Sequence, residues 1–129
     1  MEKITVYLID VFNYKSGATV IEKSMESYRE TIDSDRIDIV YRVIGREKRK
    51  YAIVYDVDGK QKEDIRIGGY ATKVDPVFFG NLFVTKYEDE GELMSISEDD
   101  AKYLTKYTDW FPLSMYPDPF PSLCCIECE

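Results

Sequence analysis

The side chains available for chemistry exclude the most common catalytic base. The sequence has 129 residues, 11 tyrosines and 3 cysteines, but no histidine. Histidine is the only side chain whose unperturbed pKa lies near neutrality, so Ser-His and Cys-His nucleophile pairs and ordinary zinc hydrolase sites are excluded. Catalysis would require carboxylate, Lys, Tyr or Cys groups with strongly shifted pKa values. The composition therefore favours a binding protein over an enzyme and predicts no cofactor.

A basic run between two tyrosines is one candidate site. An arginine offers a planar fork to phosphate, and a tyrosine ring can stack on a base. The run therefore predicts a nucleotide site, and the residues that would hold the ligand are Tyr41, Arg42, Arg46, Arg49 and Tyr51. The alternative is a solvated hairpin tip braced by tyrosine pairs, the more common role of a charge run at a turn.

An acidic set in the second half of the chain is the other candidate. It predicts a surface that imitates nucleic-acid phosphates and fits a basic groove on a partner protein. The partner-binding residues would be Glu88, Asp89, Glu90, Asp99 and Asp100. The alternative is helix capping and solubility, because Ser97 to Asp100 has the pattern of a capping box with acidic residues in the first turn.

Other patterns give weak signals for metal or phosphate. Cys124, Cys125 and Cys128 include a C-x-x-C spacing, but three thiolates are one ligand short of a closed zinc site. The stretch 56–59 resembles the start of a calcium loop, with lysines at later ligand positions. The glycines of 68–73 could bring backbone amides near a phosphate, although a plain loop is the simpler interpretation. The sequence therefore predicts no metal site.

The net charge of −8 is unevenly distributed. Residues 1–60 contain 11 acidic and 11 basic side chains, whereas residues 61–129 contain 14 acidic and 6 basic ones. The second half would repel phosphates, which argues against direct nucleic-acid binding. No apolar run approaches the ~20 residues of a membrane helix, and cysteines that cannot all pair indicate a reducing compartment. We therefore expect a cytoplasmic protein with no membrane contact.

Hydrophobic periodicity and turn residues predict short strands and two helices. Predicted strands span 4–10, 18–23, 36–44, 51–57, 63–67, 77–87 and 93–96. Helices are expected from Met25 to Ile32, after Ser24, and from Ser97 to about Trp110. Gly68 to Tyr70 should interrupt the strand pattern.

These elements predict an α+β fold with a mainly antiparallel sheet of five to six strands and two helices on one face. Residues 1–111 would form a single domain. Residues 112–129 are rich in proline and cysteine, so we expect an extended tail docked on the body or on a neighbour. The oligomeric state is left open, a homo-oligomer included.

Three stretches resemble a domain-of-unknown-function family of small proteins encoded by bacteriophages and bacterial mobile elements. They are the opening 4–32, with Val20–Lys23 leading into Met25–Tyr28, the strand and turn Ala52–Lys60, and Phe79–Val84 followed by Leu93–Glu98 and Tyr103-Leu104. The resemblance implies a phage or mobile-element origin. Because small accessory genes of such elements often act on host defence, it also implies an anti-defence role.

The leading hypothesis is therefore a non-enzymatic antagonist of bacterial immunity that binds a defence protein, such as a CRISPR or restriction nuclease, through its acidic surface. The alternative is a sponge that sequesters a nucleotide signalling molecule in the basic run. A third interpretation, an enzyme that uses carboxylates, requires at least two convergent acids in a cleft.

Overall fold

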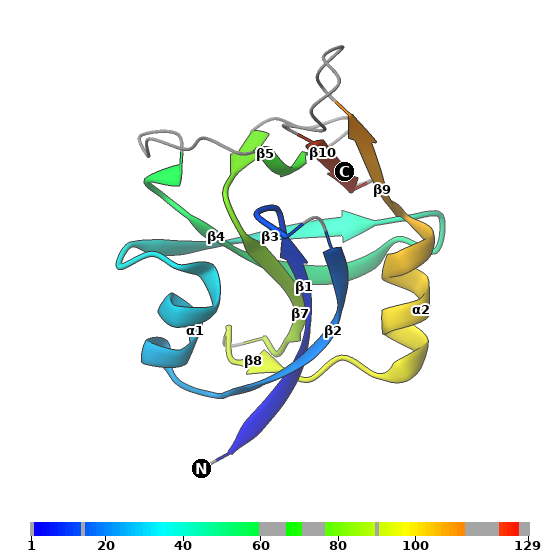
Figure 1. The fold of residues 1–129 in the computed structure, drawn as a ribbon. Coiled ribbons are helices and arrows are strands. Elements are labelled where there is room, and N and C mark those ends of the chain that lie inside the picture. The colour runs from blue at the N-terminus through cyan, green and yellow to red at the C-terminus, as the bar shows by residue number, and fades with distance from the viewer. Residues whose placement is uncertain are drawn as a thin grey trace.

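Short strands make up most of the structure, and two helices interrupt them (Figure 1). The computed structural model describes residues 2–13, 15–59, 67–70, 77–89, 91–112 and 122–126. Its elements are β1 (Lys3–Asp10), β2 (Lys15–Glu22), α1 (Met25–Ile32), β3 (Ile37–Ile44), β4 (Arg49–Asp56), β5 (Ile67–Tyr70), β6 (Val77–Phe79), β7 (Leu82–Tyr87), β8 (Leu93–Met94), α2 (Glu98–Lys106), β9 (Thr108–Pro112) and β10 (Ser122–Ile126). The predicted α+β class with a mainly antiparallel sheet is confirmed.

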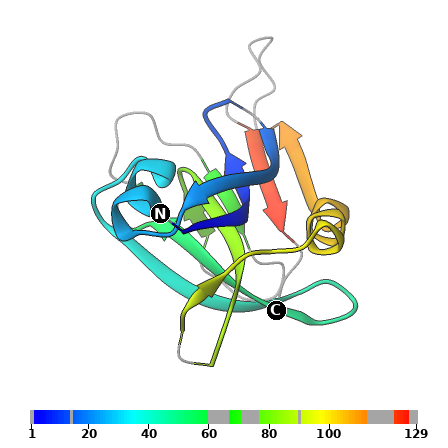
Figure 2. The same cartoon turned by 90° about the horizontal axis from the view of Figure 1, so that it is seen from below.

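The main sheet has the strand order β2-β1-β7-β4-β3, and β8 pairs with β7. Every pairing in it is antiparallel. Strand β7 is central because Val84 lies opposite both Tyr7 of β1 and Ile53 of β4. Strands β2 and β3 are the two edges, and Figure 2 shows β3, in cyan, along the outside of the sheet.

Each face of this sheet is covered by its own helix. Successive side chains of a strand point to opposite faces, and β1, β4 and β7 are apolar on both. The α1-side core contains Ile4, Val6, Tyr28, Ile32, Ala52, Val54, Phe83 and Leu93. The α2-side core contains Tyr7, Ile9, Val11, Ile44, Tyr51, Ile53, Phe78, Leu82, Val84, Ile96, Tyr103, Leu104, Tyr107 and Ile126. The predicted placement of both helices on one face is therefore wrong, because it would leave the other apolar face uncovered (Figure 1).

Helix α1 has the predicted limits because its two ends are chemically defined. The Ser24 hydroxyl accepts the Ser27 amide at 3.1 Å, which caps the first turn. Asp33 ends the helix in the left-handed conformation with φ 62°.

Neither α1 nor α2, the helices of the described residues, has the length and apolar character needed to cross a membrane.

Helix α2 ends earlier than predicted, because the chain turns into a strand after Tyr107. Strand β9 follows at Thr108 and pairs antiparallel with β10, which places Trp110 opposite Cys124. Ile126 of β10 is buried in the α2-side core. The predicted tail thus contributes a strand in its described part, while residues 113–121 and 127–129 lie outside the described residues.

Two further predictions about strands need correction. Gly68 to Tyr70 does not interrupt the pattern, because Ile67–Tyr70 forms β5 and pairs with β6. The predicted strand 77–87 is two strands, because Gly80 adopts a positive φ of 84° between β6 and β7. Residues 63–66 of another predicted strand lie outside the described residues.

Candidate functional site

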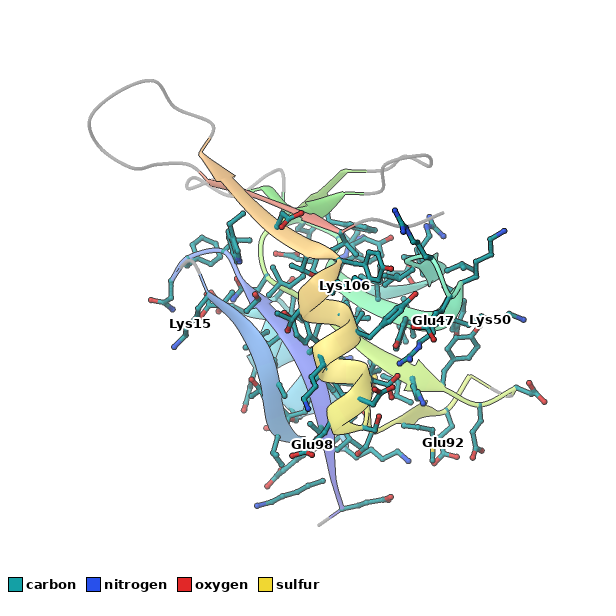
Figure 3. All side chains as sticks on the ribbon, turned by 90° about the vertical axis from the view of Figure 1, so that its right-hand side faces the viewer. Lys15, Glu47, Lys50, Glu92, Glu98 and Lys106 are labelled. Carbon is teal, nitrogen blue, oxygen red and sulfur yellow. The ribbon has the colours of Figure 1, made fainter. Side chains whose placement is uncertain are left out.

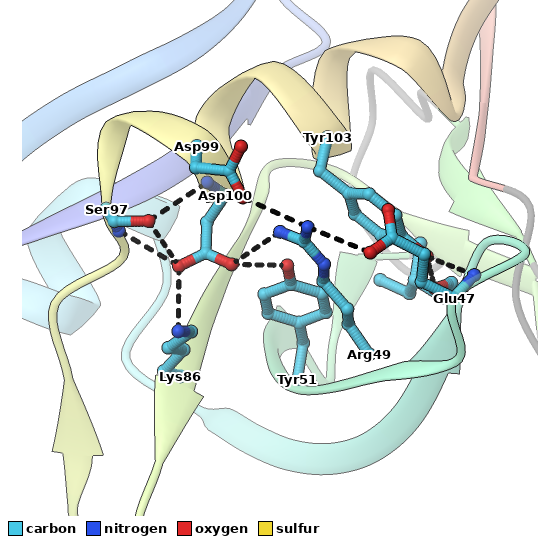
Figure 4. Close-up of polar contacts among 9 residues, drawn as sticks. Glu47, Arg49, Tyr51, Lys86, Ser97, Asp99, Asp100 and Tyr103 are labelled. Carbon is cyan, nitrogen blue, oxygen red and sulfur yellow. Dashed lines mark hydrogen bonds and ion pairs between the residues drawn. The ribbon is translucent and has the colours of Figure 1, made fainter.

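The start of α2 brings the acidic and basic candidate sets into contact (Figure 4). Ser97 caps the helix, and its hydroxyl accepts the Asp100 amide at 3.0 Å. In return, Asp100 Oδ2 accepts the Ser97 amide at 3.0 Å and the Ser97 hydroxyl at 2.9 Å. The predicted capping box is confirmed.

Asp100 is the centre of a buried polar cluster that joins three elements. Its Oδ1 accepts a hydrogen bond from the Tyr51 hydroxyl at 2.8 Å and one from Arg49 Nη1 at 3.2 Å. Its Oδ2 lies 2.9 Å from Lys86 Nζ of β7. Burial alone would raise the pKa of Asp100, but the hydrogen bonds from Ser97, Lys86 and Tyr51 hold that pKa well below its ordinary value. Asp100 is therefore a charged, fully partnered group.

Arg49 holds the β3–β4 turn against α2. Its Nη2 lies 3.0 Å from Asp99 and 3.2 Å from Glu47, and its guanidinium carbon lies 4.1 Å from the centre of the Tyr103 ring. The Tyr103 hydroxyl donates to the Ile44 carbonyl and accepts the Glu47 amide at 3.2 Å. One arginine thus pairs with Asp99 and Asp100 of α2 and with Glu47 of the turn, and it covers an aromatic ring.

Only part of the predicted acidic set is exposed in the described residues. Glu88 and Asp89 are exposed at the β7–β8 turn, and Asp99 is exposed at the start of α2. Asp100 has a relative exposure of 1%, so its carboxylate cannot reach a partner protein. Glu90 lies outside the described residues.

The five residues of the predicted nucleotide site are also separated. Tyr41 points to the α1 side, where its ring lies 4.5 Å from that of Tyr87, while Arg42 points to the α2 side. Arg46 is exposed at the turn, and Arg49 is engaged with Asp99 and Asp100. Tyr51 has 0% exposure and cannot stack on a base.

A shallow depression lies beside the Asp100 cluster. It measures about 520 Å³ and is lined by Lys48, Arg49, Lys50, Lys86, Ser97, Asp99 and Asp100. Lys48 lies in the β3–β4 turn and Lys50 lies near the start of β4, and both are exposed. Ammonium groups of this kind can hold a phosphate as point charges, although Asp99 and Asp100 reduce the positive potential.

Lys86, Glu47 and Tyr103 also belong to this cluster, although no local pattern in the sequence marks them. The spacing of Ser97 and Asp100 is visible as a cap, but two partners of Asp100, Tyr51 and Arg49, are 49 and 51 positions away on another hairpin. The basic run next to Tyr51 and the acidic start of α2 were two separate signals. Opposite charges on neighbouring elements could have suggested that they meet.

The other buried carboxylates close turns. Asp10 Oδ1 accepts the amides of Phe12 and Asn13, both at 3.2 Å, and Asp56 Oδ1 accepts the Asp58 amide at 2.9 Å. Among the described residues, no three His, Cys, Asp or Glu side chains converge on a point that could hold a metal ion. Cys124 and Cys125 lie in β10, and Cys128 falls outside the described residues.

Comparisons of the chain with protein-family models, with curated proteins and with solved structures found no match.

Proposed function

We propose that the protein is a non-enzymatic antagonist of bacterial immunity, which binds the basic groove of a defence nuclease of CRISPR or restriction type. The surface that supports this proposal is named the acidic end here. It consists of Glu88, Asp89, Glu92, Glu98 and Asp99. Figure 3 shows Glu92 and Glu98 at the same lower end of the molecule, where β8 and the start of α2 lie.

The observation that carries the proposal is a set of exposed carboxylates without an ion pair, beside two that are paired, Glu92 with Lys23 and Asp99 with Arg49. Within the described residues, Glu88, Asp89 and Glu98 are exposed and make no ion pair. Asp100, in contrast, is buried and pairs with Arg49 and Lys86. Carboxylates that only stabilise the fold have partners inside the molecule, whereas unpaired ones at one end can pair with cations of a partner protein.

The choice of partner class rests on sequence. The resemblance to phage and mobile-element proteins favours a target within bacterial host defence. Nucleases that defend the host carry basic grooves that bind nucleic acid. An acidic end placed in such a groove would compete with the phosphates of the nucleic acid. Competition of this kind is an equilibrium effect that needs no catalytic group.

The proposal is tested by inhibition of DNA cleavage. Purified protein is added to CRISPR effectors and restriction enzymes, and the cleavage of target DNA is measured at several salt concentrations. The expected result is inhibition of at least one nuclease class, weaker at higher salt. The variant E88K/D89K/E98K should lose this inhibition.

A matched control changes the net charge equally at another place. The variant E26K/E30K/D35K reverses three exposed acids at and just after α1, outside the acidic end. It should retain the inhibition. Equal loss in both variants would indicate a general charge effect, and no inhibition of any nuclease by the wild-type protein would reject the proposal.

A second function, sequestration of a nucleotide signal, has one observation in its favour. Lys48 and Lys50 line the depression beside the Asp100 cluster, although Tyr51 cannot contribute a stacking surface there. Calorimetry with cyclic nucleotides and ADP-ribose derivatives tests it. Binding that the variant K48E/K50E abolishes would favour this function, and the absence of heat with every ligand would reject it.

A further inference from the structure

Strand β3 ends the main sheet on one side with an unpaired edge. Among the described residues its only strand partner is β4. The Arg36 carbonyl accepts the Val57 amide at 3.0 Å, so the even-numbered residues of β3 exchange hydrogen bonds with β4. The odd-numbered residues therefore direct their amides and carbonyls outward. These residues are Ile37, Ile39, Tyr41 and Val43.

Two side chains of β3 occupy the outward backbone groups at its centre. Asp38 Oδ1 accepts the Ile39 amide at 2.8 Å. Arg42 Nη1 donates to the Tyr41 carbonyl at 2.9 Å, while its buried Nε has no hydrogen-bond partner within the described residues. A carboxylate on an amide and a guanidinium on a carbonyl supply the hydrogen bonds that a neighbouring strand would supply.

The sequence of β3 is complementary to itself in one antiparallel register. A two-fold axis perpendicular to the sheet preserves its faces, so only residues of the same parity can lie opposite one another. With the axis at Val40, Asp38 lies opposite Arg42 of the second copy, and Arg42 lies opposite the second copy's Asp38. In a symmetric register that is shifted by two positions in either direction, Asp38 of one copy no longer lies opposite Arg42 of the other.

The hydrogen-bond pattern agrees with this register. Ile39 lies opposite Tyr41 of the second copy, so the Ile39 amide reaches the second copy's Tyr41 carbonyl. These are the two groups that Asp38 and Arg42 occupy in the single chain. The released Asp38 and Arg42 then meet across a non-hydrogen-bonded pair, where opposite side chains are closest.

From this self-complementarity we infer that β3 is a dimerisation edge, which joins two copies of the chain into one continuous antiparallel sheet. Asp38 and Arg42 exchange their bonds to the backbone of their own strand for ion pairs across the two-fold axis. On the opposite face, Ile37 and Val43 meet at each end of the interface, with Ile39 and Tyr41 between them. Tyr41 is 45% exposed in the single chain.

The other edge of the sheet lacks this property. Strand β2 has Lys15 and Glu22 at its two ends, but these residues differ in parity and lie on opposite faces. No symmetric register can therefore place them opposite one another. The inference does not depend on the proposed function, because the variants that test it leave Glu88, Asp89 and Glu98 of the acidic end unchanged.

Charge exchange at two positions tests the inference. Sedimentation velocity over a range of protein concentrations gives the dimerisation constant of the wild-type protein, D38R, R42D and the double variant D38R/R42D. Each single variant sets like charges opposite one another at both ends of the register. We expect at least a ten-fold weaker dimer for each single variant and recovery of the dimer in the double variant.

Two controls separate this result from a change in folding. V20K places a charge on β2, at a side chain that is 61% exposed, and should leave the dimerisation constant unchanged. Hydrogen exchange should show protection of the outward amides of Ile37, Tyr41 and Val43 that rises with protein concentration. A wild-type protein that stays monomeric at all concentrations, or a dimer that survives both single variants, would overturn the inference.

Discussion

The carboxylate of Asp100 shows how a single buried charge can connect separate parts of a fold. Its two oxygens accept hydrogen bonds from the α2 cap and from Tyr51, and they pair with Arg49 and Lys86. A buried carboxylate that lost these partners would be strongly destabilising, because removal from water is unfavourable for a charge. The acid therefore stabilises the docking of α2 and has no free oxygen lone pair aimed at a ligand.

Replacement of Asp100 by asparagine should lower the free energy of unfolding by about 2 kcal/mol, because charge-assisted hydrogen bonds are lost. The pKa of Asp100 is lowered in the folded state. Its contribution is therefore fully present above the pKa of the unfolded carboxyl, about 3.9, and is lost as the pH falls below that value. Urea unfolding of wild type and D100N should give a constant difference near neutral pH and a shrinking one below about pH 4.

Asp99, the exposed neighbour of Asp100, provides the control for the D100N prediction. The side chain of Asp99 is 79% exposed, so D99N should change stability by less than about 1 kcal/mol. A difference between wild type and D100N that did not depend on pH would contradict the role of the charge.

At the level of elements, the β3–β4 turn is fitted closely to α2. Gly45 adopts φ 74°, a conformation that most side chains avoid. A Cβ atom at this position would overlap the Tyr103 hydroxyl and approach the Tyr107 ring to 2.6 Å. The turn can therefore approach the helix only because residue 45 has no side chain.

The substitution G45A should reduce the free energy of unfolding by about 2–4 kcal/mol, the sum of backbone strain and overpacking. Thermal and urea unfolding measure the effect. G17A in β2 is the matched control, because a Cβ atom there would meet nothing within 4 Å. Equal stability of the two variants would show that the turn can move away from α2 without loss.

Local signals predicted individual elements better than their arrangement. The limits of α1 follow from Ser24 and the sequence after Ile32, and the cap of α2 follows from Ser97 and Asp100. The opposite placement of the helices could have followed from β1, whose two faces are both apolar, but strand patterning does not assign a helix to a face. The end of α2 and the pairing of β9 with β10 depend on distant contacts, which periodicity does not contain.

The prediction of the candidate sites had the same limit, because local patterns do not show which elements meet. The sequence identified Arg49, Tyr51, Asp99 and Asp100 as unusual residues, but it placed them in two competing sites. The structure joins them into one cluster, because α2 packs on the face of the sheet to which Tyr51 of β4 points. The exposed acids Glu88 and Asp89 stay where sequence placed them, at a turn.

For the molecule as a whole, two cores share the central strands. Ile126 of β10 is 1% exposed and belongs to the α2-side core, although its strand pairs only with β9 in the described part of the chain. The substitution I126A should therefore lower the free energy of unfolding by about 2–4 kcal/mol, as other buried isoleucines do. V20A, at an exposed position, should change it by less than about 0.5 kcal/mol. Chemical denaturation compares the two variants. An I126A variant with the same free energy of unfolding as the wild type would show that β10 contributes little to this core.

The division into two cores also has a consequence for synthesis on the ribosome. All members of the α1-side core lie between Ile4 and Leu93, whereas the α2-side core requires Ile126. The emerging chain can thus bury one face of its sheet while the residues that complete the other face have not yet left the ribosome. During that interval the apolar side chains of β1, β4 and β7 that face α2 are open to chaperones and proteases. The interval before residues 94–126 leave the ribosome is therefore a period in which this face has no cover.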